Sequence, residues 1–203
     1  MLSGACSLLI DLHCHTRVYS SCSVLTPDAL VRAARAAGLD GVCITEHDAL
    51  WPAEKLRALA TELDFLVLTG VEVSTDAGHV LAYGLSSYGP ELSPLRALRR
   101  RADEDGALLY LSHPVRSSQL RKPANLEDSL DSLEVCNGSE GVLANETSHR
   151  LAVSFRLPGI GGSDAHSARE VGACATEFQN PVRSMDDLLR ELRAGRYRAV
   201  SLR

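Results

Sequence analysis

Short apolar runs typical of buried strands alternate with helix-like segments along the 203-residue chain, and this alternation limits the fold more than any other feature. Strands are predicted at residues 8–10, 41–45, 65–68, 70–74, 79–84, 107–111, 132–136 and 159–161. Helices are predicted at residues 27–37, 52–62, 93–105 and 185–194. This β-α-β-α order favours parallel strands with helices outside them, as a barrel or an open sheet.

Composition and charge restrict the class of protein. Hydrophobic residues make up 45% of the chain and charged residues 23%, and we predict a single soluble domain spanning residues 1–203. The net charge of -5 argues against an extended nucleic-acid surface. No apolar run approaches the roughly 18 residues of a membrane helix, and no signal peptide is recognised. We therefore expect a cytoplasmic protein without a membrane partner.

The cysteines point the same way. The chain has six of them but no Cys-x-x-Cys pair, so zinc-ribbon spacing is absent and a disulfide framework is not expected. Cys43, Cys136 and Cys174 lie in strand-like runs and are predicted to be small core residues. Reduced thiols agree with a cytoplasmic location.

The segment Asp11-Leu12-His13-Cys14-His15-Thr16 directly follows the first apolar run. Successive side chains of a strand point to opposite faces, so Asp11, His13 and His15 are expected on one face. Two imidazoles at this spacing can bind one metal ion, with Asp11 close enough to orient a ring. The alternative is a pair of surface histidines on an edge strand.

Further potential ligands lie beside the other predicted strands. They are Glu46, His47, Asp48, Glu72, His79, His113, Asp164 and His166. In a parallel α/β barrel the carboxyl ends of the strands meet at one mouth. Six of the seven histidines lie within or beside predicted strands, which packing does not explain because cores disfavour polar side chains. The seventh, His149, lies in a helix-like stretch and is expected to be structural.

The chain offers more potential ligands than the three or four protein ligands that one metal ion binds, so we expect about two or three divalent ions. Glu72 is predicted to bridge two cations through its two carboxylate oxygens. Histidines permit zinc, and carboxylates permit manganese or iron. Because histidine binds metal only when neutral, activity is predicted to fail as the pH falls through about 6.

Five segments together resemble the PHP (polymerase and histidinol phosphatase) family. They are Asp-Leu-His-Cys-His-Thr at 11–16, Leu-Asp-Gly-Val-Cys-Ile-Thr-Glu-His-Asp at 39–48, Gly-Val-Glu-Val-Ser-Thr at 70–75, Leu-Ser-His-Pro at 111–114 and Gly-Gly-Ser-Asp-Ala-His at 161–166. The likeness runs in order through nearly the whole chain. It implies a small, distorted (β/α)7 TIM-like barrel of PHP type, with a multinuclear metal site that hydrolyses phosphate esters.

The resemblance also implies roles by position. One metal ion would be bound by His13, His15, Glu72 and Asp164, a second by His47 and His166, and a third by Glu72, His79 and His113. The family commonly has an Asp or His ligand five or six residues after the second histidine, where this chain has Ser20 and Ser21. The second metal site is therefore expected to be weakened, with water completion or help from Cys22 as alternatives.

Substrate contacts are predicted from the basic residues near His113. Arg116 suits phosphate oxygens because its guanidinium is planar and always charged, and with Glu72 and Asp164 it completes the predicted catalytic residues. A surface arginine paired with an acid is the alternative. Arg121 and Lys122 are further candidates for substrate binding, and Asn137 is either a hydrogen-bonding residue of the site or part of an Asn-Gly turn.

The resulting hypothesis is a metal-dependent phosphoesterase that hydrolyses a small phosphate monoester or a nucleotide phosphate by metal-activated water. Histidinol phosphate, nucleoside bisphosphates and the ends of short oligonucleotides all fit such a site. One alternative is a catalytically weak PHP module that binds metal and supports a partner protein. Another is an amidohydrolase-type C–N hydrolase, although its bridging lysine has no counterpart, since Lys55 and Lys122 are not at strand ends. The substrate, the metal identity and the oligomeric state stay open.

Overall fold

The computed structural model describes residues 7–116 and 126–203. Its strands are β1 (Leu8–Cys14), β2 (Gly41–His47), β3 (Leu66–Thr75), β4 (Gly78–Tyr83), β5 (Leu108–Leu111), β6 (Ser132–Asn137), β7 (Ile160–Gly162), β8 (Cys174–Phe178) and β9 (Tyr197–Ser201). Its α-helices are α1 (Pro27–Ala36), α2 (Ala53–Leu63), α3 (Leu95–Asp105), α4 (Leu126–Ser129), α5 (Val142–Ala152) and α6 (Met185–Arg193), and a 3-10 turn, η1, spans Pro90–Leu92.

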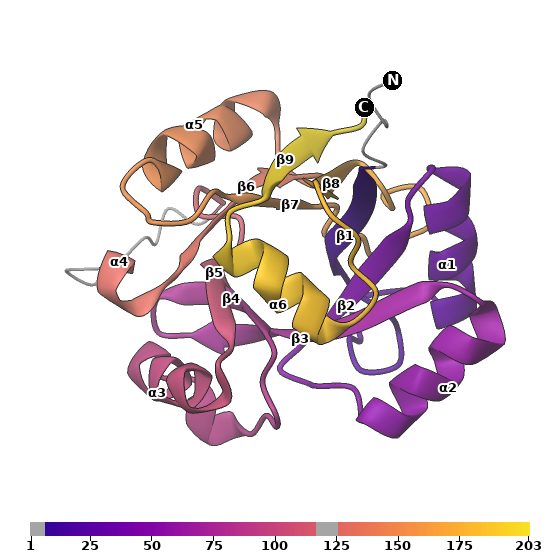
Figure 1. The fold of residues 1–203 in the computed structure, drawn as a ribbon, viewed down its shortest axis with the longest axis horizontal. Coiled ribbons are helices and arrows are strands. Elements are labelled where there is room, and N and C mark those ends of the chain that lie inside the picture. The colour runs from indigo at the N-terminus through magenta and orange to yellow at the C-terminus, as the bar shows by residue number, and fades with distance from the viewer. Residues whose placement is uncertain (1–6, 117–125) are drawn as a thin grey trace.

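The nine strands of the described residues form one sheet in the order β7-β6-β5-β4-β3-β2-β1-β8-β9, which curls into a nearly closed barrel (Figure 1). Strands β1 to β3 pair in parallel, as do β5 to β7, whereas β4 pairs antiparallel with both β3 and β5. Six strands therefore run in one direction, and their carboxyl ends share one mouth. The predicted α/β barrel is confirmed.

The barrel differs from the predicted parallel arrangement at two places. Strand β4 follows β3 after Asp76 and Ala77 alone, and a connection this short forces antiparallel pairing. Strand β8 pairs antiparallel with β1 and with β9. Cys174, expected in a strand-like run, is the first residue of β8, whereas the sequence predicts no strand at β9 because polar residues such as Arg198 interrupt the apolar pattern.

Local sequence explains the positions of several elements. Thr26 accepts a hydrogen bond from the Ala29 N–H and Pro27 occupies the first turn, so α1 begins where an N-cap residue and a proline meet. The two strands predicted at 65–68 and 70–74 are one strand, β3. Gly70 allows this continuity, because a Cβ at this position would lie 2.8 Å from the carbonyl oxygen of Ala82 on β4.

Helix α6 lies across the middle of the ring of strands instead of outside it (Figure 1). Leu188, Leu189 and Leu192 join the cluster formed by inward-facing strand residues such as Ile10 and Leu12. This helix closes the barrel at the amino ends of the parallel strands, since Leu189 packs against Gly84, which follows β4. The opposite mouth, at the carboxyl ends, is left for polar side chains.

The seam between the two ends of the sheet lies where β7 meets β1 and β8. An isolated parallel bridge pairs Cys14 with Ala165 there. The Thr176 hydroxyl of β8 accepts a hydrogen bond from the Gly161 N–H and donates one to the Gly161 carbonyl, both at 2.9 Å. Side-chain hydrogen bonds thus replace a continuous ladder at the seam.

Candidate metal centre

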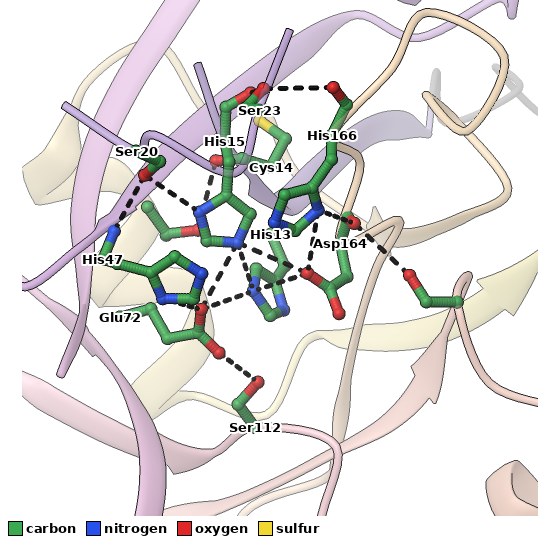
Figure 2. Close-up of polar contacts among 12 residues, drawn as sticks. His13, Cys14, His15, Ser20, Ser23, His47, Glu72, Ser112, Asp164 and His166 are labelled. Atoms are coloured by element: carbon green, nitrogen blue, oxygen red, sulfur yellow. Dashed lines mark hydrogen bonds and ion pairs between the residues drawn. The ribbon is translucent and has the colours of Figure 1, made fainter. Parts of the chain in front are cut away.

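The eight predicted metal ligands converge at the carboxyl-end mouth of the barrel. His13 lies in β1 and His15 just beyond it, His47 ends β2, Glu72 lies in β3, His79 in β4, His113 follows β5, and Asp164 and His166 follow β7. His79 stands near the start of its strand, yet it reaches the same mouth because β4 runs antiparallel to β3. Figure 2 shows six of these side chains meeting at one point.

Glu72 is the centre of the cluster, because its two carboxylate oxygens face five histidines. Oε2 lies 3.0 Å from Nδ1 of His47, and 3.3 and 3.4 Å from Nε2 of His15 and His13. Oε1 lies 3.1 Å from Nε2 of His113 and 3.2 Å from Nδ1 of His79. The carboxylate is fully buried at the bottom of the mouth.

Asp164 forms the other wall of the cluster. Its Oδ1 lies 3.3 Å from Nε2 of His15, 3.5 Å from Nε2 of His13 and 3.7 Å from Nδ1 of His166. The backbone of Asp164 has a φ of 53°, and that of His113 a φ of 30°. Residues other than glycine rarely adopt this left-handed region, and such strain concentrates at functional sites. Both residues are therefore held in place by the surrounding structure.

Glu134 belongs to the candidate site although its sequence context does not predict it. It lies buried in β6, and its Oε1 is 2.9 Å from Nδ1 of His13. Its Oε2 accepts hydrogen bonds from the backbone N–H of His113 at 2.9 Å and from Nδ2 of Asn137 at 2.8 Å. The sequence does contain one indication of this role, because Glu134 is a carboxylate between Leu133 and Val135 in a largely apolar strand.

Three other acids near the motifs bind protein groups instead of facing the cluster. Asp11 accepts hydrogen bonds from the backbone N–H groups of His13, Ser163 and Gly172, so it ties β1 to the segment after β7. The expected contact between Asp11 and an imidazole ring is therefore wrong, and Glu134 orients the ring of His13 instead. Asp48 accepts from the N–H of Ser74 at 2.9 Å.

Glu46 holds the loop that follows β1. Its carboxylate accepts hydrogen bonds from the hydroxyls of Thr16 and Ser20 and from Nε1 of Trp51. The Ser20 oxygen in turn accepts the N–H of His47 at 3.0 Å and lies 3.5 Å from Nδ1 of His15. Ser20 thus positions two histidines, while the neighbouring Ser21 and Cys22 are exposed.

The donor set fits divalent cations. Three groups have ligand atoms within 4.8 Å of one another: His13 with His15 and Asp164, His15 with His47 and His166, and His47 with Glu72 and His79. Glu134 accepts the Nδ1 proton of His13, so the lone pair that His13 exposes on losing its other proton is at Nε2, 3.1 Å from Nε2 of His15. Oε2 of Glu72 is buried without a hydrogen-bond partner. A cation among these atoms would satisfy all of them.

The charges of the cluster are strongly coupled. Burial alone would lower the pKa of His13, but the carboxylates of Glu134, Asp164 and Glu72 raise it well above its ordinary value. Burial lowers the pKa of His15 to about 4, so this imidazole is neutral at neutral pH. Burial also opposes ionisation of Glu72, yet His13 and the hydrogen bonds of the nearby histidines hold the Glu72 pKa well below its usual range. In the metal-free protein, the His13 imidazole therefore tends to keep its proton beside the ionised carboxylate of Glu72.

Arg116 lies beside the cluster and pairs with acids. Its Nη2 is 2.7 Å from Oδ2 of Asp164 and 3.2 Å from Oδ1 of Asn137, and its Nε donates to Glu140. The guanidinium therefore lies at the mouth, as a phosphate-binding role requires. It is also paired with two acids, as expected if Arg116 were a surface arginine in an ion pair. Arg121 and Lys122 lie outside the described residues, and His149 is exposed on α5.

The sequence places this geometry in a family. A family model described as the PHP domain matches residues 11–151, and a model described as PHP-associated matches residues 142–197. The chain belongs to the PHP family. The two matches together include all eight residues of the cluster and Glu134.

Two curated relatives are informative about this PHP protein. A 5'-3' exoribonuclease of Haemophilus influenzae is 32% identical over 105 residues, which are 47% of this chain and 38% of the exoribonuclease. The chain thus matches well under half of that relative's length. An uncharacterized protein of Methanocaldococcus jannaschii is 29% identical over 189 residues, covering 88% of this chain and 74% of the relative.

Solved structures share the fold of this PHP protein. PsfC from Pseudomonas syringae has a TM-score of 0.73 at 19% identity, covering 96% of this chain and 91% of PsfC. A Bifidobacterium adolescentis protein proposed to be a metal-dependent phosphoesterase has a TM-score of 0.65 at 20% identity, covering 92% and 96%. An amidohydrolase from Chromobacterium violaceum has a TM-score of 0.67 at 18% identity, covering 96% and 98%.

Among the described residues, no helix combines the length and the apolar character that crossing a membrane requires.

Proposed function

We propose that this PHP protein is a metal-dependent phosphoesterase that hydrolyses a small phosphate monoester or a nucleotide phosphate by metal-activated water. Membership of the PHP family supports the general class of hydrolase. The single observation that carries the proposal is the buried carboxylate of Glu72, whose oxygens lie between 3.0 and 3.4 Å from nitrogens of five histidines. A packed core gives no reason for such a cluster, because buried polar groups cost free energy unless they are paired.

The cluster suits two or three cations. His13, His15, Glu72 and Asp164 would hold one, His47 and His166 a second, and Glu72 with His79 and His113 a third, as the resemblance to the PHP family implies. Divalent cations bound there would lower the pKa of water and neutralise phosphate oxygens. The ligand types favour zinc, manganese or iron.

The protein side chains supply orientation and charge. Glu134 fixes the ring of His13, and Ser20 fixes the backbone of His47. Arg116 is the proposed phosphate-binding residue, because its guanidinium reaches the mouth and stays charged at every working pH. A cation held by Asp164 would compete with Arg116 for this carboxylate, and the Arg116 guanidinium would then be available to bind a phosphate oxygen.

The substrate is proposed to be small and phosphorylated, either a nucleotide or the end of a short oligonucleotide. The name of the Haemophilus influenzae relative, a 5'-3' exoribonuclease, supports the nucleotide class. The net charge of -5 disfavours a long nucleic-acid track.

Two other functions compete with this proposal. An amidohydrolase of the kind that bridges two metals with a modified lysine needs a lysine at a strand end, whereas Lys55 lies on α2. A metal-binding module without turnover would keep the same cluster and would show no hydrolysis. Both alternatives are separated from the phosphoesterase by one experiment.

The test is a hydrolysis screen of the protein supplied with Zn²⁺, Mn²⁺ or Fe²⁺, using aryl phosphates, histidinol phosphate, nucleotides and short oligonucleotides, with amides as a comparison. We expect phosphate release that fails with Glu72→Gln and survives His149→Ala, the matched change at the exposed histidine of α5. Amide cleavage without phosphate release would overturn the proposal in favour of an amidohydrolase. Full metal loading without any hydrolysis would overturn it in favour of an inert module.

A further inference from the structure

Two buried thiols meet across the seam of the barrel. Cys136 lies in β6 and Cys174 in β8, and their Sγ atoms are 2.8 Å apart although 38 positions separate them in the chain. Strand β6 pairs with β7, the strand at one end of the sheet, and β8 pairs with β9, the strand at the other end. The pair therefore joins two parts of the sheet that share no backbone ladder.

Close backbone packing keeps the two thiols together. A Cβ on Gly138, two residues after Cys136, would lie 2.6 Å from Cβ of Ala173. Gly161 of β7 pairs with Cys136, and a Cβ on Gly161 would collide with the carbonyl oxygen of Ala175. Glycines thus let the segments on both sides of the cysteines approach, so the proximity comes from the backbone as well as from the side-chain rotamers.

The other described cysteines are arranged differently. Cys14 donates its S–H to the carbonyl oxygen of Cys43 at 3.3 Å, and both side chains are fully buried. Cys22 is exposed on the loop after β1. Cys136 is 7% exposed, and the hydrogen bond with the thiol of Cys174 lowers the Cys136 pKa. Within the described residues, Cys136 therefore combines some solvent access with a partner thiol in contact.

We propose that Cys136 and Cys174 form a disulfide site that a peroxide oxidises and that closes the barrel seam covalently. The Cys136 thiolate attacks one oxygen of hydrogen peroxide, the O–O bond breaks, and hydroxide leaves. The Cys174 sulfur then attacks the resulting sulfenic sulfur, the S–O bond breaks, and the oxygen leaves as water with the Cys174 proton. In total, the two thiols lose two protons and two electrons, and the peroxide becomes two water molecules.

The crosslink would act mainly on stability. A disulfide between distant positions removes conformational freedom from the unfolded chain, and its effect grows with the length of the loop that it closes. For a chain of this size we expect the melting temperature to rise by roughly 5–10 °C on oxidation.

The experiment uses the full chain carrying Cys6→Ser and Cys22→Ser, which leaves Cys14, Cys43, Cys136 and Cys174. After hydrogen peroxide treatment, we expect the intact mass to lose two hydrogens and alkylation under denaturing conditions to modify only two thiols. Peptide mapping should join the peptides of Cys136 and Cys174. The higher melting temperature should return to its original value on reduction.

Variants in the same background sharpen the test. Cys136→Ser and, should it fold poorly, Cys174→Ser are expected to show no crosslink and no melting shift, whereas Cys14→Ser keeps both. Four alkylated thiols after peroxide treatment, or a crosslink through Cys14 or Cys43, would overturn the proposal. These readouts need no hydrolytic activity, so they stand apart from the test of the phosphoesterase.

Discussion

Nδ1 of His13 lies 2.9 Å from Oε1 of Glu134, and both side chains are fully buried. The histidine belongs to β1 and the carboxylate to β6, which are separated by four strands in the sheet order. This pair crosses the interior of the barrel and fixes which imidazole nitrogen faces the cluster. It is therefore one of the contacts through which β6 positions the candidate metal centre.

Replacing Glu134 should weaken cation binding without removing a proposed ligand. Glu134→Gln removes the charge that holds the Nδ1 proton of His13, and we expect cation affinity to fall roughly 10–100-fold. Competition with a chromophoric chelator measures the affinity. Glu177→Gln, which alters an acid paired with Arg198 on the outer strands, is the control and should leave the affinity unchanged. Equal affinity in Glu134→Gln and the native protein would remove this orienting role.

Cation uptake should release protons. The pKa of His13 is raised by its carboxylate neighbours, so this imidazole is protonated in the metal-free protein and must lose its proton to bind a cation. His15, with a pKa lowered to about 4, needs no such step. We expect affinity and activity to rise with pH up to the pKa of His13 and to fail in acid. Calorimetric titrations in buffers of different ionisation enthalpy count the protons, and a count of zero at pH 6 would contradict this.

Arg116 should affect substrate binding more than turnover. Arg116→Ala removes the guanidinium beside Asp164, and we expect KM for a phosphate substrate to rise roughly tenfold or more. Arg116→Lys should restore part of the loss, because it keeps the charge but not the planar fork. Steady-state kinetics separates KM from kcat. An unchanged KM in Arg116→Ala would leave the arginine only its pairing with Glu140 and Asp164.

The serines after His15 offer a test of the weakened second site. Ser21 is exposed, and a hydroxyl is a poor ligand compared with a carboxylate. Ser21→Asp is expected to raise the number of metal ions bound per chain, as measured by elemental analysis after dialysis. Thr61→Asp, an exposed change on α2, is the control. An unchanged metal content in Ser21→Asp would mean that the second site does not need a ligand from this loop.

Acid stability should depend on an ion pair far from the mouth. Hydrogen bonds from Arg196 lower the pKa of Glu191 to about 2, below its ordinary value of 4.5. Ionised Glu191 thus stabilises the fold above pH 4.5, and this contribution is lost as the pH falls from 4.5 towards 2. Glu191→Gln should lower the free energy of unfolding at pH 7 by about 1 kcal/mol. It should also make the free energy of unfolding fall less steeply between pH 4.5 and pH 2. Denaturant titrations at several pH values measure both effects. If the free energy of unfolding of Glu191→Gln fell as steeply below pH 4.5 as that of the native protein, the pair with Arg196 would not be the cause.

Much of the site was predictable because metal ligands are chemically distinctive. His13, His15 and Glu72 stand out in sequence, since polar side chains inside apolar strand patterns need a partner. Glu134 escaped prediction because one carboxylate in a strand does not say which side chain it faces. Strand β4 runs antiparallel to β3, and this direction brings His79 to the mouth. The short connection between the two strands indicates antiparallel pairing, but the β-α-β-α order of the rest of the chain favours parallel strands.

The sequence by itself determined strands β1 to β7, helices α1, α2, α3 and α6, and the ligand types, because periodicity and residue chemistry are local properties. Only the tertiary structure decided which nitrogen of His13 faces Glu72, that Ser20 holds His47, and that Cys136 meets Cys174 across the seam. These relationships join residues far apart in the chain, and they depend on how the sheet curls and closes. Such contacts depend on the direction and packing of strands that are distant in the chain, so a local sequence pattern does not predict them.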